Sequence, residues 1–268
     1  MDLQARFGTE TPLIGMVHLP ALPGAPEYDG SREALRERAH GDARALAESG
    51  FDAALVENFG DAPFYPESVP KHTVAEMTAI TQEVAAAIDL PVGVNVLRND
   101  AEAALSVASA AGGSFVRVNV HAGVRATDQG WIEGRAHETM RLRERLDTDV
   151  AVFADIDVKH SASPVDRDAE SLARETIERG LADGLIVSGP ETGSAADADT
   201  LERVVAARDD CAPETPVLVG SGVRVENAAS LLAIADGAIV GTAVKKDGNT
   251  TNRIDSERAA ALVETLAD

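Results

Sequence analysis

The sequence predicts an α/β protein, a single (βα)8 TIM barrel over residues 1–268. Three observations lead to this fold class: the length, a regular alternation of strand and helix patterns, and an even composition along the chain. The 268 residues match the usual size of one eight-stranded barrel domain. Short β-branched runs alternate with Ala-rich and charged stretches from end to end, which favours parallel strands joined by crossover helices.

Eight strands and eight helices are predicted in strict alternation. The strands are expected over 12–18, 52–58, 91–97, 115–121, 150–159, 183–188, 216–220 and 236–241. The helices are expected over 31–49, 71–88, 100–111, 134–147, 166–179, 198–207, 225–234 and 255–267. Pro91 and Pro216 introduce strands, whereas Ser31 and Asp100 are helix-start signals. Eight βα units with no leftover segment fit a closed barrel better than an open sheet, because closure leaves no strand edge unpaired.

The charge balance excludes two classes of partner. Lys and Arg total 24 against 45 Asp and Glu, a net charge of −21 that repels nucleic acids and anionic membranes. Only four of the basic residues are lysines. Acidic excess with few lysines predicts a halophilic protein kept soluble in molar salt, where the Debye length shrinks to about 3 Å. An ordinary acidic protein is the alternative.

The remaining composition predicts a soluble, cytoplasmic protein. Cys211 is the only cysteine, so an intrachain disulfide is impossible, and its acidic surroundings indicate an unreactive thiol. The first residues carry no signal-peptide pattern. No apolar run approaches the ~18 residues that a membrane span requires, so membrane insertion is not expected.

Polar side chains gather where the predicted strands end, which is where barrel enzymes build their active sites. In the fifth strand, Asp155, Asp157 and Lys159 alternate with apolar residues and therefore face the barrel interior or its mouth. Asp157 is the candidate general acid/base, and Lys159 would stabilise developing negative charge. Schiff-base chemistry at Lys159 ranks lower, because two nearby aspartates would raise its pKa rather than depress it.

The first four strands contribute further candidates. Arg117, Asn119 and His121 share one parity in the fourth strand, with Asn95 in the third. Asn95, Arg117 and Asn119 would orient substrate hydroxyls. His18 ends the first strand and Glu57 the second, and both are candidate catalytic groups, as is Asp155 of the fifth strand. The alternative for Arg117 and Asp155 is a buried ion pair that only fills the barrel. Glu57 and Asp155 are also candidate ligands for Mg²⁺, which prefers carboxylate oxygens.

Small residues follow the last two strands. Gly220, Ser221 and Gly222 end the seventh strand, and Gly241 and Thr242 end the eighth. Their backbone can approach an anion closely, and barrel enzymes frequently bind phosphate with these two loops. Gly193, after the sixth strand, could extend this site. The alternative is that these glycines only form tight turns. The long loop after the fourth strand suits a mobile lid anchored by Trp131, and a plain surface loop is the alternative.

Several sequence strings resemble those of the BtpA/SgcQ family. They are IGMVHLP at 14–20, LPGAP at 22–26, VENFGDAPF at 56–64, PVGVNVLRND at 91–100, FVRVNV at 115–120, TDQG at 127–130, ADIDVKH at 154–160, GSGV at 220–223 and GAIVGT at 237–242. The family is similar to the ribulose-phosphate-binding barrels, which supports phosphate at 220–222 and 241–242. One member is associated with photosystem I biogenesis, others lie among sugar-metabolism genes, and halophile members are sometimes labelled phosphoribosyltransferases.

These observations lead to one functional expectation and one rival. The expected function is an enzyme acting on a small phosphorylated sugar or ribosyl compound by isomerisation, aldol cleavage or ribosyl transfer. Mg²⁺ is the one cofactor considered, and a homo-oligomer is one possible assembly. The rival is a non-catalytic assembly or biogenesis factor that keeps a ligand-binding barrel.

Overall fold

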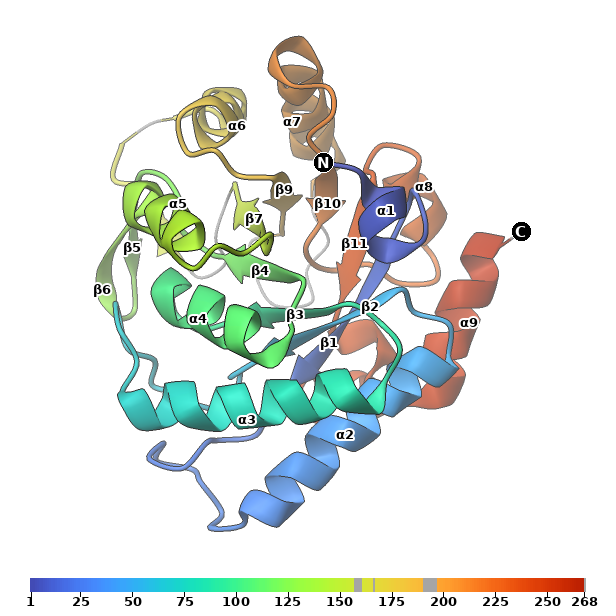
Figure 1. The fold of residues 1–268 in the computed structure, drawn as a ribbon. Coiled ribbons are helices and arrows are strands. Elements are labelled where there is room, and N and C mark those ends of the chain that lie inside the picture. Colours follow the sequence, from blue (N-terminus) through green and yellow to red (C-terminus); the bar gives the residue numbers. More distant parts are fainter. Residues whose placement is uncertain (157–160, 166, 190–196, 268) are drawn as a thin grey trace.

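The computed structural model describes residues 1–156, 161–165, 167–189 and 197–267. Within these residues, eight parallel strands close into a barrel in the order β1–β11–β10–β9–β7–β4–β3–β2 (Figure 1). The strands are β1 (Leu13–His18), β2 (Ala53–Glu57), β3 (Val92–Asn95), β4 (Phe115–Val118), β7 (Ala151–Asp155), β9 (Gly184–Val187), β10 (Val217–Val219) and β11 (Gly237–Val240). The predicted fold class is confirmed, and each barrel strand lies within its predicted range; residues 157–159 of the predicted fifth strand lie outside the described residues.

Helices surround the barrel (Figure 1). They are α2 (Arg32–Glu48), α3 (Lys71–Ala87), α4 (Ala101–Ala111), α5 (Ala136–Arg145), α6 (Ala169–Glu178), α7 (Ala198–Cys211), α8 (Ala228–Leu232) and α9 (Ser256–Ala267). The predicted start signals act as caps: the side chain of Ser31 accepts from Ala34 N and that of Asp100 from Ala103 N. Within the described residues, no helix is long and apolar enough to cross a membrane.

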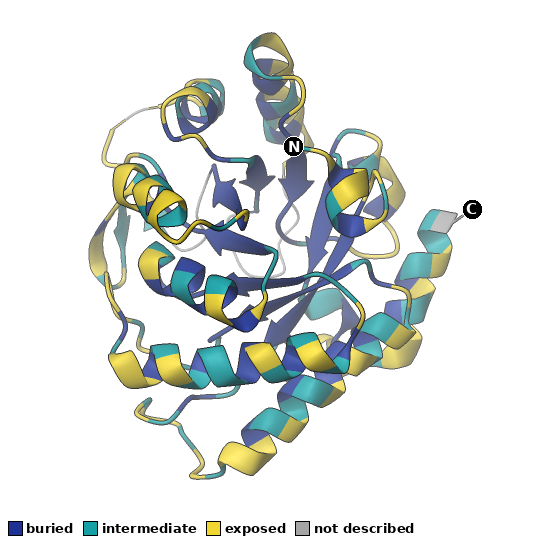
Figure 2. Cartoon of the chain, in the orientation of Figure 1, coloured by how far each residue is buried: buried dark blue, intermediate teal, exposed yellow. Residues whose placement is uncertain are grey.

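The barrel strands separate two apolar layers. Outward-facing valines such as Val116 and Val118 belong to the large core beneath the helices, and Figure 2 shows the strands buried between partly exposed helices. Inward-facing Phe115 and Phe153 fill the barrel with their ring centroids 5.8 Å apart. Phe7 of α1 (Leu3–Phe7) packs edge-on against Phe115. These apolar side chains fill the end of the barrel where the strands begin. The polar inward-facing residues therefore lie at the opposite end, where the strands terminate.

The loop after β4 differs from the predicted lid. Its residues form β5 (Val124–Thr127) and β6 (Gly130–Glu133), which join β8 (Ser161–Ala162) in a small antiparallel sheet. The predicted anchor, Trp131, is 61% exposed, whereas its neighbour Ile132 is buried against Val120. The assignment of Trp131 was wrong because side chains alternate along β6, and that alternation turns Ile132 rather than Trp131 toward the core.

The segment after β10 also differs from the prediction. A helix was expected over 225–234, but α8 has only five residues, Ala228–Leu232. Residues 225–227 form a turn, in which Arg224 N donates to Asn227 Oδ1 at 2.7 Å. The Asn227 side chain donates in turn to Gly222 O at 3.0 Å. These two hydrogen bonds of Asn227 therefore determine the shape of the loop. Because α8 has only five residues, its helix dipole contributes little to binding an anion.

Candidate functional site

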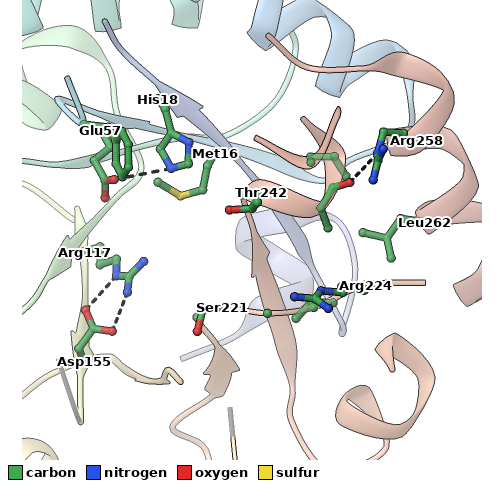
Figure 3. Close-up of a pocket in the computed structure, with 18 of the residues that line it drawn as sticks. Met16, His18, Glu57, Arg117, Asp155, Ser221, Arg224, Thr242, Arg258 and Leu262 are labelled. Atoms are coloured by element: carbon green, nitrogen blue, oxygen red, sulfur yellow. Dashed lines mark hydrogen bonds and ion pairs between the residues drawn. The ribbon is translucent and has the colours of Figure 1, made fainter. Parts of the chain in front are cut away.

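A cavity of about 690 Å³ opens where the barrel strands end. Figure 3 shows its lining, with side chains from β1, β2, β4 and β7 on one side and from the last two βα loops on the other. Ten of the predicted site residues line this cavity: His18, Glu57, Arg117, Asn119, Asp155, Gly220, Ser221, Gly222, Gly241 and Thr242. The tertiary structure thus brings the two predicted clusters into one site.

Arg117 and Asp155 form a buried bidentate ion pair across β4 and β7. Arg117 Nε donates to Asp155 Oδ2 at 2.9 Å and Nη2 donates to Oδ1 at 2.8 Å. Asn119 Nδ2 also donates to Oδ2, at 3.0 Å, and Ser188 Oγ lies 3.3 Å from Oδ1. Burial lowers the pKa of Arg117, but the charge and hydrogen bonds of Asp155, with the charge of Glu57, outweigh it and leave that pKa raised. Asp155 is therefore well placed to position Arg117 and Asn119.

His18 and Glu57 form a second pair on the neighbouring strands β1 and β2. His18 Nε2 lies 3.7 Å from Glu57 Oε1, and both side chains are buried. The Phe59 ring packs on the imidazole with a centroid distance of 4.6 Å. A methyl group at Gly241 would come within 3.1 Å of His18 Cε1. The ring is thus tightly held, and an imidazole beside a carboxylate is an arrangement suited to proton transfer.

Asn95 supports the site from β3. Its Nδ2 donates to Arg117 O at 2.9 Å and to Asn119 Oδ1 at 3.2 Å, and the side chain is buried. Asn95 is not one of the described residues that line the cavity. Its geometry therefore fits the positioning of Asn119 better than the predicted contact with substrate hydroxyls.

The predicted phosphate loops lie side by side at the cavity, but their amides are not equivalent. Gly220 N donates to Val187 O at 2.8 Å within the sheet, so it is not available to an anion. A Cβ at Gly220 would lie 2.3 Å from Ile186 Cγ2, so this glycine is required by packing. Gly222 has a left-handed φ of +70°, the conformation that glycine favours. The candidate donors toward an anion are thus the segments at Ser221–Gly222 and Gly241–Thr242 rather than Gly220.

Three arginines that the sequence analysis gave no role also line the cavity: Arg98, Arg224 and Arg258. Arg98 Nε donates to Gln129 Oε1 at 3.0 Å, and its guanidinium lies 5.7 Å from the Phe64 ring centroid. Arg258 comes from α9 and donates through Nε to Ala243 O at 3.1 Å. Strand-end reasoning could not find Arg258, because it is a helix residue near the end of the chain.

Asp155 is one of the two carboxylates predicted as candidate Mg²⁺ ligands, and its oxygens face the Arg117 guanidinium. Both Asp155 oxygens already accept hydrogen bonds from Arg117. In the part of the chain that the structure describes, no three His, Cys, Asp or Glu side chains gather closely enough to hold a metal ion. Asp157, Lys159 and Gly193 lie outside the described residues.

His121 follows the predicted parity of Arg117 and Asn119 but does not share their site. It is buried, and its Nε2 is 2.8 Å from Gly180 O, which makes Nε2 the donor nitrogen. Its Nδ1 is buried without a hydrogen-bond partner among the described residues. Burial lowers the pKa of His121 and outweighs the hydrogen bond to Gly180 and the charge of Asp183.

Comparisons with known proteins agree with this architecture. The chain is 45% identical over 268 residues to the photosystem I biogenesis protein BtpA of Synechocystis sp., covering 100% of this chain and 92% of that protein. It is 34% identical over 267 residues to the sgc region protein SgcQ of Escherichia coli, covering 98% and 97%. N-(5'-phosphoribosyl)anthranilate isomerase from Pyrococcus furiosus shares the fold, with a TM-score of 0.57 at 12% identity over 96% and 98% of the two chains. Because the BtpA family model also matches residues 9–268, this chain belongs to the BtpA family.

Proposed function

We propose that this chain is an enzyme that binds a small phosphorylated sugar or ribosyl compound in the cavity at the barrel mouth. One observation carries the proposal: a single cavity joins the His18–Glu57 and Arg117–Asp155 pairs to the loops after β10 and β11 (Figure 3). The first group of residues suits proton transfer and hydroxyl recognition, and the second suits a phosphate. A substrate that carries both kinds of group would span the cavity.

The phosphate end would lie at the loops after β10 and β11, which are the seventh and eighth strands of the barrel. Barrel enzymes frequently bind phosphate there. Arg224 and Arg258 line the same end of the cavity. In a chain with a net charge of −21, local positive charge is needed to attract an anion, and these arginines would supply it.

The reacting end would lie at β1, β2, β4 and β7. Arg117 and Asn119, both held by Asp155, would donate hydrogen bonds to substrate oxygens. Glu57 and His18 are candidates for proton transfer. Asp157 as general acid/base and Lys159 as a stabiliser of negative charge remain proposals from the sequence. Isomerisation, aldol cleavage and ribosyl transfer all use such groups, so the proposal covers this set of reactions, with phosphoribosyl transfer as one member.

A non-catalytic biogenesis factor is the second candidate, because a relative 45% identical over the whole chain bears that name. Both candidates can bind a ligand, but only the enzyme turns it over. The cavity is lined by both polar pairs and by Arg98, Arg224 and Arg258. An open cavity with these side chains favours a ligand-binding role over a purely structural one.

Thermal unfolding in concentrated KCl with a panel of pentose phosphates and phosphoribosyl compounds tests the proposal. A true ligand at 100 times its Kd stabilises the folded state by about 2.7 kcal/mol. Gly222→Asp should abolish this shift, whereas Gly222→Asn, which has the same size and backbone strain but no charge, should retain more of it. The absence of any stabilising phosphorylated compound would contradict the proposal. Binding without turnover of any panel member would favour the biogenesis candidate.

A further inference from the structure

We propose that the phosphate bound by this protein is internal to its ligand, with an apolar or aromatic group attached beyond it. A sugar joined through a diphosphate to a nucleoside has this chemistry. The inference rests on the proposed function and deepens it, because it names the class of compound that the same site would accept.

The cavity continues past the proposed phosphate position. In Figure 3, Thr242 and Ser221 lie between two groups of side chains. On one side are the His18–Glu57 and Arg117–Asp155 pairs. On the other side are Arg224, Arg258 and Leu262, and all of these residues line the same cavity. A phosphate held near Thr242 and Ser221 would therefore have lining residues on both sides.

The part beyond Thr242 is here called the outer compartment and is lined by Arg224, Val225, Arg258, Ala261 and Leu262. Arg258, Ala261 and Leu262 are spaced i, i+3 and i+4 in α9, so one face of that helix forms a wall. Val225, from the loop after β10, is 43% exposed. The outer compartment thus combines apolar surface with two guanidinium groups.

An outer compartment with both apolar surface and two guanidinium groups is better suited to binding a second group of the ligand than to holding only water. Arginine pairs with phosphate oxygens and also stacks on aromatic rings, so Arg224 and Arg258 can serve both a diphosphate and an attached base. Arg258 Nε is held by Ala243 O at 3.1 Å, which fixes its guanidinium beside the 3-10 turn Thr242–Val244. A ligand ending in its phosphate would leave the exposed Ala261 and Val225 uncovered, whereas Leu262 is already buried in the core.

The size of the cavity leads to the same conclusion. Its volume of about 690 Å³ lies near the middle of the ~300–1,000 Å³ range found for sites that enclose drug-sized ligands. A pentose phosphate is smaller than such ligands and would occupy the inner part with its sugar and the loops with its phosphate. The outer compartment accounts for the remaining space.

Two matched probes test the inference by titration calorimetry. Ribose 5-phosphate ends in its phosphate, whereas ADP-ribose contains the same ribose phosphate linked through a second phosphate to adenosine. We expect ADP-ribose to bind at least tenfold more tightly. Ala261→Gln places a longer polar side chain in the outer compartment at an exposed helix position. It should remove most of this tenfold gain and leave ribose 5-phosphate binding unchanged.

Ala260→Gln is the matched control, because Ala260 is the adjacent position on α9 and is not among the cavity-lining residues that the structure describes. It should bind both probes like the unmodified protein. Equal affinities for the two probes would overturn the inference and leave the proposed function intact. A gain for ADP-ribose that survives Ala261→Gln would also overturn it. Failure of ADP-ribose to bind would overturn the inference, whereas the proposed function is contradicted only if the whole panel of phosphorylated compounds fails as well.

Discussion

Arg117 and Asp155 meet through two parallel hydrogen bonds, at 2.9 Å and 2.8 Å, at the inner wall of the barrel mouth. Both side chains are buried, and the Asp155 carboxylate also accepts from Asn119. Two charges removed from water in this way depend on each other, because either one alone would be an uncompensated buried charge. The pair therefore links the stability of the barrel mouth to the positions of Arg117 and Asn119, which both line the cavity.

Asp155→Ala should destabilise the protein by about 3–5 kcal/mol, because it leaves the Arg117 guanidinium buried without its partner. Urea unfolding measures this change. The double variant, Arg117→Met with Asp155→Leu, removes both charges. Its loss in free energy of unfolding should be much smaller than the sum of the losses in Arg117→Met and Asp155→Leu measured separately. A loss below 1 kcal/mol for Asp155→Ala would show that the pair is not structural and would return Asp155 to the list of reacting groups.

Glu57→Gln should lower turnover by roughly 10²–10⁴-fold on a substrate found by the ligand screen, since that is the usual contribution of a general acid or base. The Glu57 carboxylate lies 3.7 Å from His18 Nε2, and the amide keeps its shape without its charge. Binding of the substrate should stay close to that of the unmodified protein. Glu264→Gln, at an exposed position on α9, is the control and should leave turnover unchanged. Unaltered turnover in Glu57→Gln would remove Glu57 from the reaction.

Asp157→Asn tests the role that the sequence assigns to Asp157. If Asp157 is the general acid/base, the variant should bind the substrate and lose turnover, because the amide cannot exchange the proton. Steady-state kinetics with a parallel binding measurement separate the two effects. Full activity would shift the search for the acid/base group to Glu57 and His18 and would leave the proposed phosphate site unaffected.

His121 should make stability fall in mild acid. Burial lowers its pKa below the ordinary value of 6.5, and no described residue accepts a hydrogen bond from Nδ1 once this nitrogen is protonated. Well above pH 6.5 the imidazole is neutral in the folded and unfolded states alike. As the pH falls below 6.5, the unfolded chain takes up a proton that the folded chain resists, so the free energy of unfolding decreases.

His121→Gln is the variant that checks this pH dependence. Its side-chain amide can still donate to Gly180 O, but it does not titrate. Melting temperatures measured from about pH 8 to about pH 5 should fall less steeply for His121→Gln than for the unmodified protein. Parallel curves would show that His121 does not contribute to acid sensitivity.

The acidic surface yields a prediction about salt. With a net charge of −21, repulsion between carboxylates should grow as salt is removed, because the screening length increases. Circular dichroism across a KCl series should therefore show a lower melting temperature at millimolar than at molar salt. A constant melting temperature would mean that the acidity is not an adaptation to concentrated salt.

The sequence alone determined the barrel and the direction in which its strand residues face. Alternation along a strand is a local property, so Val116 and Val118 could be assigned to the helix-covered face and Arg117 to the interior. The same reasoning located Asp155, Glu57 and His18 at the strand ends. It did not predict that Asn95 Nδ2 donates to Arg117 O and Asn119 Oδ1, because hydrogen-bond partners on a neighbouring strand depend on register.

Only the tertiary structure decided which distant segments share the cavity. Arg258 on α9 reaches the cavity because the last helix packs beside the loop after β11, and nothing in its local sequence distinguishes it from a surface arginine. Gly220 has the composition of a phosphate loop, yet its amide is used by the sheet. Ile132 rather than Trp131 is buried because the β5–β6 hairpin docks on Val120. Local periodicity specifies orientation, whereas packing between segments far apart in the chain decides which groups are available to a ligand.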